Sequence, residues 1–247
     1  PVDVYEEILR VYGFDNIPIP QKVNYIPSVI PKNAPNKIKA KISNYLASIG
    51  FNEIMNNSLV PSKNYTEEQL TEAIPMLNPL SSDMDVMRME LVNSALSSVA
   101  YNVNRKIGSV KFFEFGKTYF KKGGKYLENE VLQLTFSGSR HPEHWSVKAQ
   151  KATAIELVDV ATNVLKKLNI PAKKGAKLIE VHSINKKQLK QHGLKQDVVT
   201  ISLDWEKCLA MASDEVTLKE IPVFPIVRRD LSLVLDKDAS YKEVQKI

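Results

Sequence analysis

The chain has 247 residues, of which 43% are hydrophobic and 25% are charged, and its net charge is +6. This composition is typical of a soluble globular protein with one large or two smaller domains. The single cysteine, Cys208, excludes an internal disulfide bond and favours a reducing, cytoplasmic setting. No apolar run approaches the roughly 20 residues that cross a bilayer, so we expect no membrane partner.

The first predicted element is an amphipathic helix over residues 3–12. At 100° per residue, its apolar side chains share one face. The opposite face carries the charged side chains, which are Asp3, Glu6, Glu7 and Arg10. Gly13 is expected to end the helix. Residues 18–35 contain five prolines with little periodicity and are predicted to form a linker.

A second helix is predicted for residues 36–49 and should end at Gly50. Its apolar residues keep the i, i+4, i+7, i+8, i+11 spacing of one helical face. These residues are Ile38, Ile42, Tyr45, Leu46 and Ile49. Extended chain over 52–60, a strand over 76–81 that an Asn-Pro pair breaks, and a third helix over 90–104 are expected to follow.

The central region predicts an antiparallel hairpin. Residues 110–120 and 131–136 are rich in apolar and aromatic side chains, and a Lys-Lys-Gly-Gly-Lys turn begins at Lys121. A helix over 153–168 and strands near 178–182 and 198–203 complete an α+β fold with an antiparallel sheet.

A domain boundary is expected near residue 215, where prolines interrupt the chain again. Beyond it, residues 231–235 are predicted to form a strand and residues 240–247 the start of a helix. The ends of the sequence indicate to us that the chain is part of a longer polypeptide.

Three stretches resemble the β subunits of bacterial phenylalanyl-tRNA synthetases. They are DVYEEILRVYGFDNIP from Asp3, NPLSSDMDVMRMELVNSALSSVAYNVNR from Asn78 with FFEFGKTYF from Phe112, and FPIVRRDLSLVLD from Phe224. They occur in the order and spacing of that family and together span the chain. The chain is therefore identified as similar to an internal part of such a β subunit.

The resemblance implies a class II aminoacyl-tRNA synthetase-like core, an antiparallel sheet flanked by helices, without catalytic residues. Residues 1–20 correspond to the end of the preceding small (B5) domain, residues 21–215 to the core, and residues 216–247 to a linker and the first elements of the ferredoxin-like anticodon-binding domain. In the family, the active site lies on a separate α subunit, and two α and two β chains act on tRNA(Phe) with ATP. The apolar stripe of the helix over 36–49 is expected to hold the α subunit.

A metal site can be considered at Asp3, Glu6 and Glu7, whose spacing points three carboxylates the same way on a helix. From spacing alone, we favour a solvated face on which Arg10 pairs with Glu6 and Glu7. The resemblance implies a Mg²⁺ site at these three residues, with a further aspartate upstream of Pro1. We therefore expect an incomplete and weak Mg²⁺ site.

Class II chemistry needs arginines that hold the ATP phosphates. In the family's active α subunit, the motif 2 segment reads Gly-Arg-Val-Tyr-Arg, whereas the similar segment here ends in Phe120. The counterpart of the motif 3 arginine is Lys207, which lacks the bidentate fork of a guanidinium. We therefore expect ATP to be used by the full enzyme and not bound here.

Arg88 and Glu114 admit two interpretations. Together with Lys207 they could serve an active class II ligase-like enzyme. Alternatively, Arg88 pairs with Glu90 or Asp85 to lock a loop, and Glu114 belongs to the polar face of a strand. We favour the structural interpretation and a supporting, non-catalytic role.

The lysines around the hairpin turn, Lys121, Lys122 and Lys125, also admit two interpretations. They could contact an RNA backbone, or they could simply be solvated, as lysine-rich turns usually are. The alternative to the supporting role is accordingly a free-standing basic RNA-binding module.

Overall fold

The computed structural model describes residues 2–22, 25–26, 34–141, 144–215, 218, 222–235 and 244. The chain divides into two units, one up to Asp214 and one from Glu215. Within the described residues, no helix is both long and apolar enough to span a bilayer.

The second unit has no regular structure over its longest described stretch, residues 222–235. The predicted strand over 231–235 is therefore wrong. Its apolar side chains are exposed, with Val234 fully so, and among the described residues no strand pairs with this stretch. The predicted helix over 240–247 lies outside the described residues except for Val244.

The first helix, α1 (Val2–Tyr12), confirms the predicted amphipathic segment. Gly13 follows it with φ of 90°, a conformation that glycine adopts without strain, and the 3₁₀ turn η1 (Phe14–Asn16) comes next. The described residues of the predicted linker, 18–22, 25–26 and 34, form neither helix nor strand. Its other residues, apart from Pro35, lie outside the described ones.

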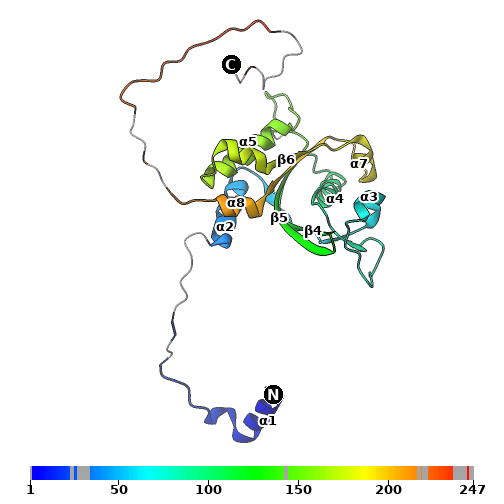
Figure 1. Ribbon diagram of the computed structural model, residues 1–247, viewed down its shortest axis with the longest axis vertical. Helices are drawn as coiled ribbons and strands as arrows, with labels where there is room; N and C mark the ends of the chain where they lie inside the picture. Colours follow the sequence, from blue (N-terminus) through cyan, green and yellow to red (C-terminus); the bar gives the residue numbers. More distant parts are fainter. Residues whose placement is uncertain are drawn as a thin grey trace. The chain divides into compact units, whose positions relative to one another are not determined.

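A mixed five-stranded sheet forms the framework of the first unit (Figure 1). Its strand order is β1-β4-β5-β7-β6. The strands are β1 (Asn52–Glu53), β4 (Val110–Lys122), β5 (Lys125–Ser137), β6 (Ile179–His182) and β7 (Val198–Asp204). All neighbouring pairs are antiparallel except β1 and β4, which run parallel. The α+β prediction is confirmed, but the sheet is not wholly antiparallel as expected.

Helices cover both faces of this sheet. On one face, α2 (Pro35–Ser48), α5 (Ala154–Lys167) and α8 (Trp205–Met211) pack against the main core (Figure 1). On the other face, α4 (Val92–Val103) and α7 (Lys186–Gln191) enclose a smaller cluster around Leu96 and Phe112. The short elements α6 (Ala172–Gly175) and η3 (Ala176–Leu178) lead into β6.

A small two-stranded sheet occupies the segment between β1 and α4. Its strands β2 (Leu59–Val60) and β3 (Val86–Met87) are antiparallel, and between them lie η2 (Ser62–Asn64) and α3 (Glu67–Leu70). The strand expected over 76–81 is absent, and only an isolated bridge joins Pro75 to Val86. Leu77 and Leu80 are almost fully exposed, so that stretch has no sheet face to bury.

The apolar stripe of α2 faces the chain's own core, which corrects the expectation that it holds a partner. Ile42 and Leu46 are 0% exposed, and Ile38 is partly buried against the same cluster. Ile49 is 37% exposed. The predicted helix is correct, but its stripe is already used internally.

Candidate functional site

A buried ion pair between Arg88 and Glu114 lies at the centre of the candidate site. Arg88 Nη1 and Glu114 Oε1 are 2.7 Å apart, and the two side chains are 4% and 3% exposed. Arg88 Nε donates to the carbonyl of Lys117 at 2.9 Å, and Nη1 also donates to the carbonyl of Asn56 at 3.3 Å. The guanidinium is therefore bound by groups of the chain itself.

Asn56 donates two further hydrogen bonds to the Glu114 carboxylate. Its side-chain amide donates to Oε2 at 2.7 Å and its backbone N–H donates to Oε1 at 3.2 Å. Ser98 of α4 in turn donates to Asn56 Oδ1 at 2.7 Å. Because every member has partners, this network rigidifies the junction between β4 and α4 instead of leaving a reactive group free.

Gly116 provides the space into which the Arg88 side chain extends. A Cβ at this position would lie 2.6 Å from Arg88 Nη2 and 2.8 Å from Leu91 Cδ2, both far below contact distance. Glycine therefore permits the guanidinium to lie against the β4 backbone.

The residues after Arg88 are fixed by further buried groups. Met89 N donates to the Tyr65 hydroxyl at 3.1 Å. Glu90 accepts from the backbone N–H groups of Val92 and Asn93 and so caps α4. Burial raises the pKa of the Glu90 carboxyl above its usual range and raises the pKa of Tyr65 to about 12. Both groups hold the loop after Arg88 through these hydrogen bonds.

The prediction that Arg88 pairs with Glu90 or Asp85 is wrong. Asp85 accepts instead from the backbone and hydroxyl of Ser62, both at 2.7 Å, and Glu90 caps α4. The partner is Glu114, a residue 26 positions away. The structural role predicted for Arg88 is confirmed although its partner differs, because its side chain binds Glu114 and the Lys117 carbonyl and so ties the loop to β4.

The other residues of the enzyme-like alternative lie apart from this pair. Lys207 binds Asp204 at 2.7 Å on α8, whose Trp205 and Cys208 pack on the other sheet face. Lys117 binds Glu128 at 2.8 Å near the outer part of the hairpin. The structure does not gather Arg88, Glu114 and Lys207 into one site.

Three buried polar side chains on the Glu114 face were missed by sequence reasoning. Gln133, Thr135 and Thr200 are at most 2% exposed. Gln133 Nε2 donates to Thr135 Oγ1 at 3.3 Å, and the two threonine hydroxyls lie 3.1 Å apart. The register of β5 and β7 places these residues on one face, and their burial depends on segments that pack on that face from elsewhere in the sequence.

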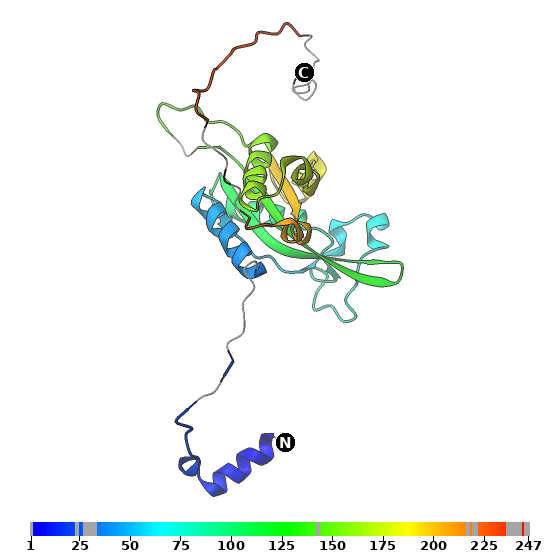
Figure 2. The same cartoon turned by 60° about the vertical axis from the view of Figure 1, so that its left-hand side comes forward.

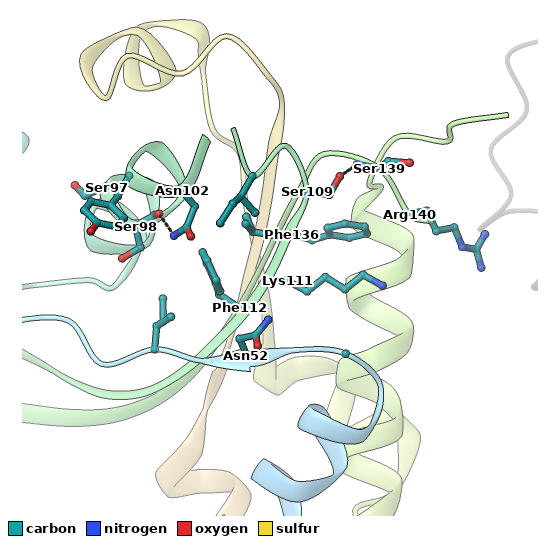
Figure 3. Close-up of a pocket in the computed structure, with 15 residues that line it drawn as sticks. Asn52, Ser97, Ser98, Asn102, Ser109, Lys111, Phe112, Phe136, Ser139 and Arg140 are labelled. Carbon is teal, nitrogen blue, oxygen red and sulfur yellow. Dashed lines mark hydrogen bonds between the residues drawn. The ribbon is translucent and has the colours of Figure 1, made fainter. Parts of the chain in front are cut away.

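An open cavity of about 980 Å³ lies beside the edge strand β1 (Figure 3). Phe112 and Phe136 line it, and α4 contributes Ser97, Ser98 and Asn102. Its two cations are engaged within the chain. Lys111 Nζ lies 5.0 Å from the Phe136 ring centroid, and Arg140 binds Glu156 at 2.8 Å. The lining of the cavity therefore combines aromatic rings and neutral polar side chains with two cations that already have partners within the chain.

The predicted metal residues lie on α1, whose residues are all exposed except for the half-buried Leu9. Arg10 binds Glu6 at 2.7 Å and Glu7 at 3.1 Å. Within the part of the chain that the structure describes, no three His, Cys, Asp or Glu side chains are grouped to hold a metal ion. The residues Asp3, Glu6 and Glu7 thus provide no preformed site.

Comparison with known proteins identifies one family. Residues 19–192 match the family described as "Phenylalanyl tRNA synthetase beta chain CLM domain". The chain is 33% identical to the "Phenylalanine--tRNA ligase beta subunit" of Bacteroides thetaiotaomicron over 99% of its length. It is 28% identical to the protein of the same name from Thermotoga maritima over 96% of its length.

These matches cover only part of the relatives. The aligned region is 34% of the Bacteroides thetaiotaomicron protein and 32% of the Thermotoga maritima protein, so the chain spans about a third of the relatives' length. The family match covers most of the described sheet and its helices. The chain belongs to the phenylalanyl tRNA synthetase beta chain CLM domain family.

Proposed function

We propose that this chain is a non-catalytic core of a phenylalanine–tRNA ligase β subunit, which supports a catalytic α subunit and tRNA(Phe) during aminoacylation. The assembled ligase joins phenylalanine to its tRNA with ATP in the cytoplasm. In this proposal the chain supports the assembly in which the reaction takes place, and it does not itself bind ATP.

The observation that carries the proposal is the locked guanidinium of Arg88. A phosphate-binding arginine needs free N–H groups directed at the ligand. Here the guanidinium is buried and bound to Glu114 and to two carbonyls. Phe120 stands where the family's motif 2 arginine is expected, and Lys207 is paired with Asp204. Of the three positions that would bind the ATP phosphates, one is therefore apolar and the other two carry cations that are bound within the chain.

The fold supports a class II synthetase-like core, which we also propose. The hairpin of β4 and β5 occupies the motif 2 segment, and β7 followed by α8 occupies the motif 3 segment. On this proposal, residues 1–20 end a preceding small domain, residues 21–215 form the core, and residues 216–247 lead into an anticodon-binding domain.

The α subunit contacts the exposed side of α2 and not the apolar stripe, because the stripe is buried in the chain's own core. This exposed side carries small and polar residues, which are Ala40, Lys41, Asn44 and Ala47. Small side chains let a partner helix approach closely, and the arrangement of two α and two β chains is part of the same proposal.

Sedimentation velocity of this chain mixed with a purified α subunit tests the proposal. We expect a faster-sedimenting complex at micromolar concentration, which Ala47→Glu weakens by placing a bulky charge in the contact. Substitution of the exposed Glu53 by Gln is the matched control and leaves the complex intact. Absence of any complex with the unchanged chain contradicts the proposal.

We include a weak Mg²⁺ site at Asp3, Glu6 and Glu7 as a separate part of the proposal. Binding requires Arg10 to release both glutamates, which lowers the affinity. Titration calorimetry with Mg²⁺ measures this affinity, and the double change Glu6→Gln with Glu7→Gln removes the binding heat if these carboxylates are ligands.

A further inference from the structure

The outer part of the β4–β5 hairpin extends beyond the sheet as a two-stranded ribbon (Figure 2). β7 pairs with β5 only over residues 131–137, and β1 pairs with β4 only at Phe112 and Phe113. Residues 121–129 are all exposed. Two-stranded ribbons are marginally stable by themselves, so the tip depends on local geometry to keep its shape.

The turn and one edge of the ribbon provide that geometry. Gly123 and Gly124 have φ of 57° and 78°, as a two-residue type I′ turn requires. Along the β4 edge, Lys121 N donates to the carbonyl of Glu72 at 2.7 Å, and Tyr119 N donates to that of Arg88 at 2.9 Å. The tip is therefore held in a defined orientation.

The register places two lysines directly opposite each other at the last rung, Lys122 against Lys125. Like charges in this arrangement repel and destabilise a hairpin. Among the described residues, neither ammonium group forms a salt bridge. The ribbon thus keeps an unfavourable charge pair that a bound anion would relieve.

The two faces of the ribbon differ in charge. Alternation places Lys122 and Lys125 on the same face as Phe120, Leu127 and Asn129. That face carries no carboxylate over residues 118–122 and 125–129. The opposite face carries Glu128, whose negative charge is paired with Lys117. The positive potential is therefore concentrated on the lysine-pair face.

The chemistry of this tip suits an RNA backbone. Lysine acts as a point charge, which matches phosphate oxygens without demanding a planar partner. On the opposite face of the tip, Tyr126 is 68% exposed and Lys121 Nζ lies 5.6 Å from its ring centroid, so that face offers an aromatic surface for base stacking.

We propose that Lys122 and Lys125 contact the phosphate backbone of RNA, which in the ligase assembly is the bound tRNA. This inference rests on the proposed function for the identity of the RNA. The hairpin is an RNA contact of the β chain that is separate from its contact with the α subunit.

The test compares Lys122→Ala/Lys125→Ala with Lys186→Ala/Lys187→Ala, which removes two exposed lysines from α7. Fluorescence anisotropy measures binding of a tRNA transcript to the full chain at several salt concentrations. We expect the hairpin variant to bind more weakly and its slope of log Kobs against log salt to fall by about 2, whereas the α7 variant keeps the parent slope.

Thermal unfolding separates this result from misfolding. Removal of a like-charge pair leaves the melting temperature of the hairpin variant unchanged or raises it, so weaker binding reflects lost contacts. Polyglutamate serves as a competitor, and we expect it to displace the tRNA poorly.

Equal losses in the two variants, no loss in the hairpin variant, or no binding of tRNA by the unchanged chain contradicts the proposal. Displacement by polyglutamate as effective as by unlabelled tRNA also contradicts it and points to an acidic protein.

The hairpin variant is expected to form the same sedimenting complex with the α subunit as the unchanged chain does. A failed RNA experiment therefore leaves the proposed supporting function standing, while lack of α association counts against that function.

Discussion

At the scale of residues, Arg88 and Glu114 show how a charged pair can be structural. Burial makes the pair costly to break, because the remaining charge has no water to solvate it. Glu114→Gln keeps the shape of the side chain and leaves Arg88 without a counter-charge. We expect a loss of about 3–5 kcal/mol in the free energy of unfolding, measured by urea denaturation.

The exposed pair Lys117–Glu128 is the control for that experiment. Its side chains are 47% and 55% exposed, so Glu128→Gln is expected to change the free energy of unfolding far less than Glu114→Gln does. Replacement of both Arg88 and Glu114 by Met and Leu should cost much less than the two single changes added together. Similar losses for Glu114→Gln and Glu128→Gln would show that the buried network is unimportant.

The half-buried His192 predicts a dependence of stability on pH. Its ring nitrogens lie 3.3 Å from Asn93 Oδ1 and 3.2 Å from Ser97 Oγ, and burial lowers its pKa below the usual value. Above about pH 6.5 the histidine is neutral in both states. As the pH falls further, the unfolded chain takes up the proton first, so stability decreases.

His192→Gln removes this titration and keeps a polar side chain. The unfolding free energy of the variant should therefore fall less than that of the parent between about pH 7.5 and about pH 5.5. His182, whose pKa burial also lowers, remains in both proteins and cancels in the comparison. Parallel pH curves for parent and variant would contradict the assignment.

At the scale of elements, α2 separates what local sequence predicts from what it does not. The apolar spacing around Ile42 and Leu46 predicted a helix correctly, as the aromatic strands and the Gly123–Gly124 turn predicted the hairpin. The target of the helix's apolar stripe depends on residues distant in sequence, such as Phe113 and Leu157. Local periodicity therefore predicts which face of a helix is apolar, but it does not predict which other element packs against that face.

The same limit explains the missed parts of the candidate site. The partner of Arg88 is on β4, and the direction of β1 beside β4 depends on the whole intervening segment. Nearby carboxylates, Asp85 and Glu90, were the natural candidates from sequence distance alone. The resemblance to known sequences identified the family, and it also showed that Phe120 stands where that family's catalytic subunit has an arginine. Residue spacing alone could not have shown either.

The buried position of Leu46 gives a direct prediction for α2. Leu46→Ala leaves a cavity in the main core, and we expect a loss of about 2–5 kcal/mol in the free energy of unfolding. Ala47→Glu changes an exposed neighbour and should leave chemical denaturation nearly unchanged. If Leu46→Ala has little effect on stability but abolishes association with the α subunit, then the stripe is an interface after all.

At the scale of the whole molecule, the chain combines an internally closed core with surfaces that remain available. The sheet is covered on both faces by its own helices (Figure 1), and the cations expected near a nucleotide are paired. The exposed side of α2 and the hairpin tip are separate surfaces, which suits a protein that contacts more than one component of an assembly.

Phenylalanine-dependent ATP–pyrophosphate exchange by the isolated chain tests the central claim most directly. With ATP, Mg²⁺ and phenylalanine present, we predict exchange no faster than in buffer, because the Arg88 guanidinium is already bound by Glu114 and the chain's own carbonyls. Addition of ATP should also leave the melting temperature unchanged. Clear exchange that is lost in a folded Arg88→Met variant would contradict the account, since it would make this chain a catalyst in its own right.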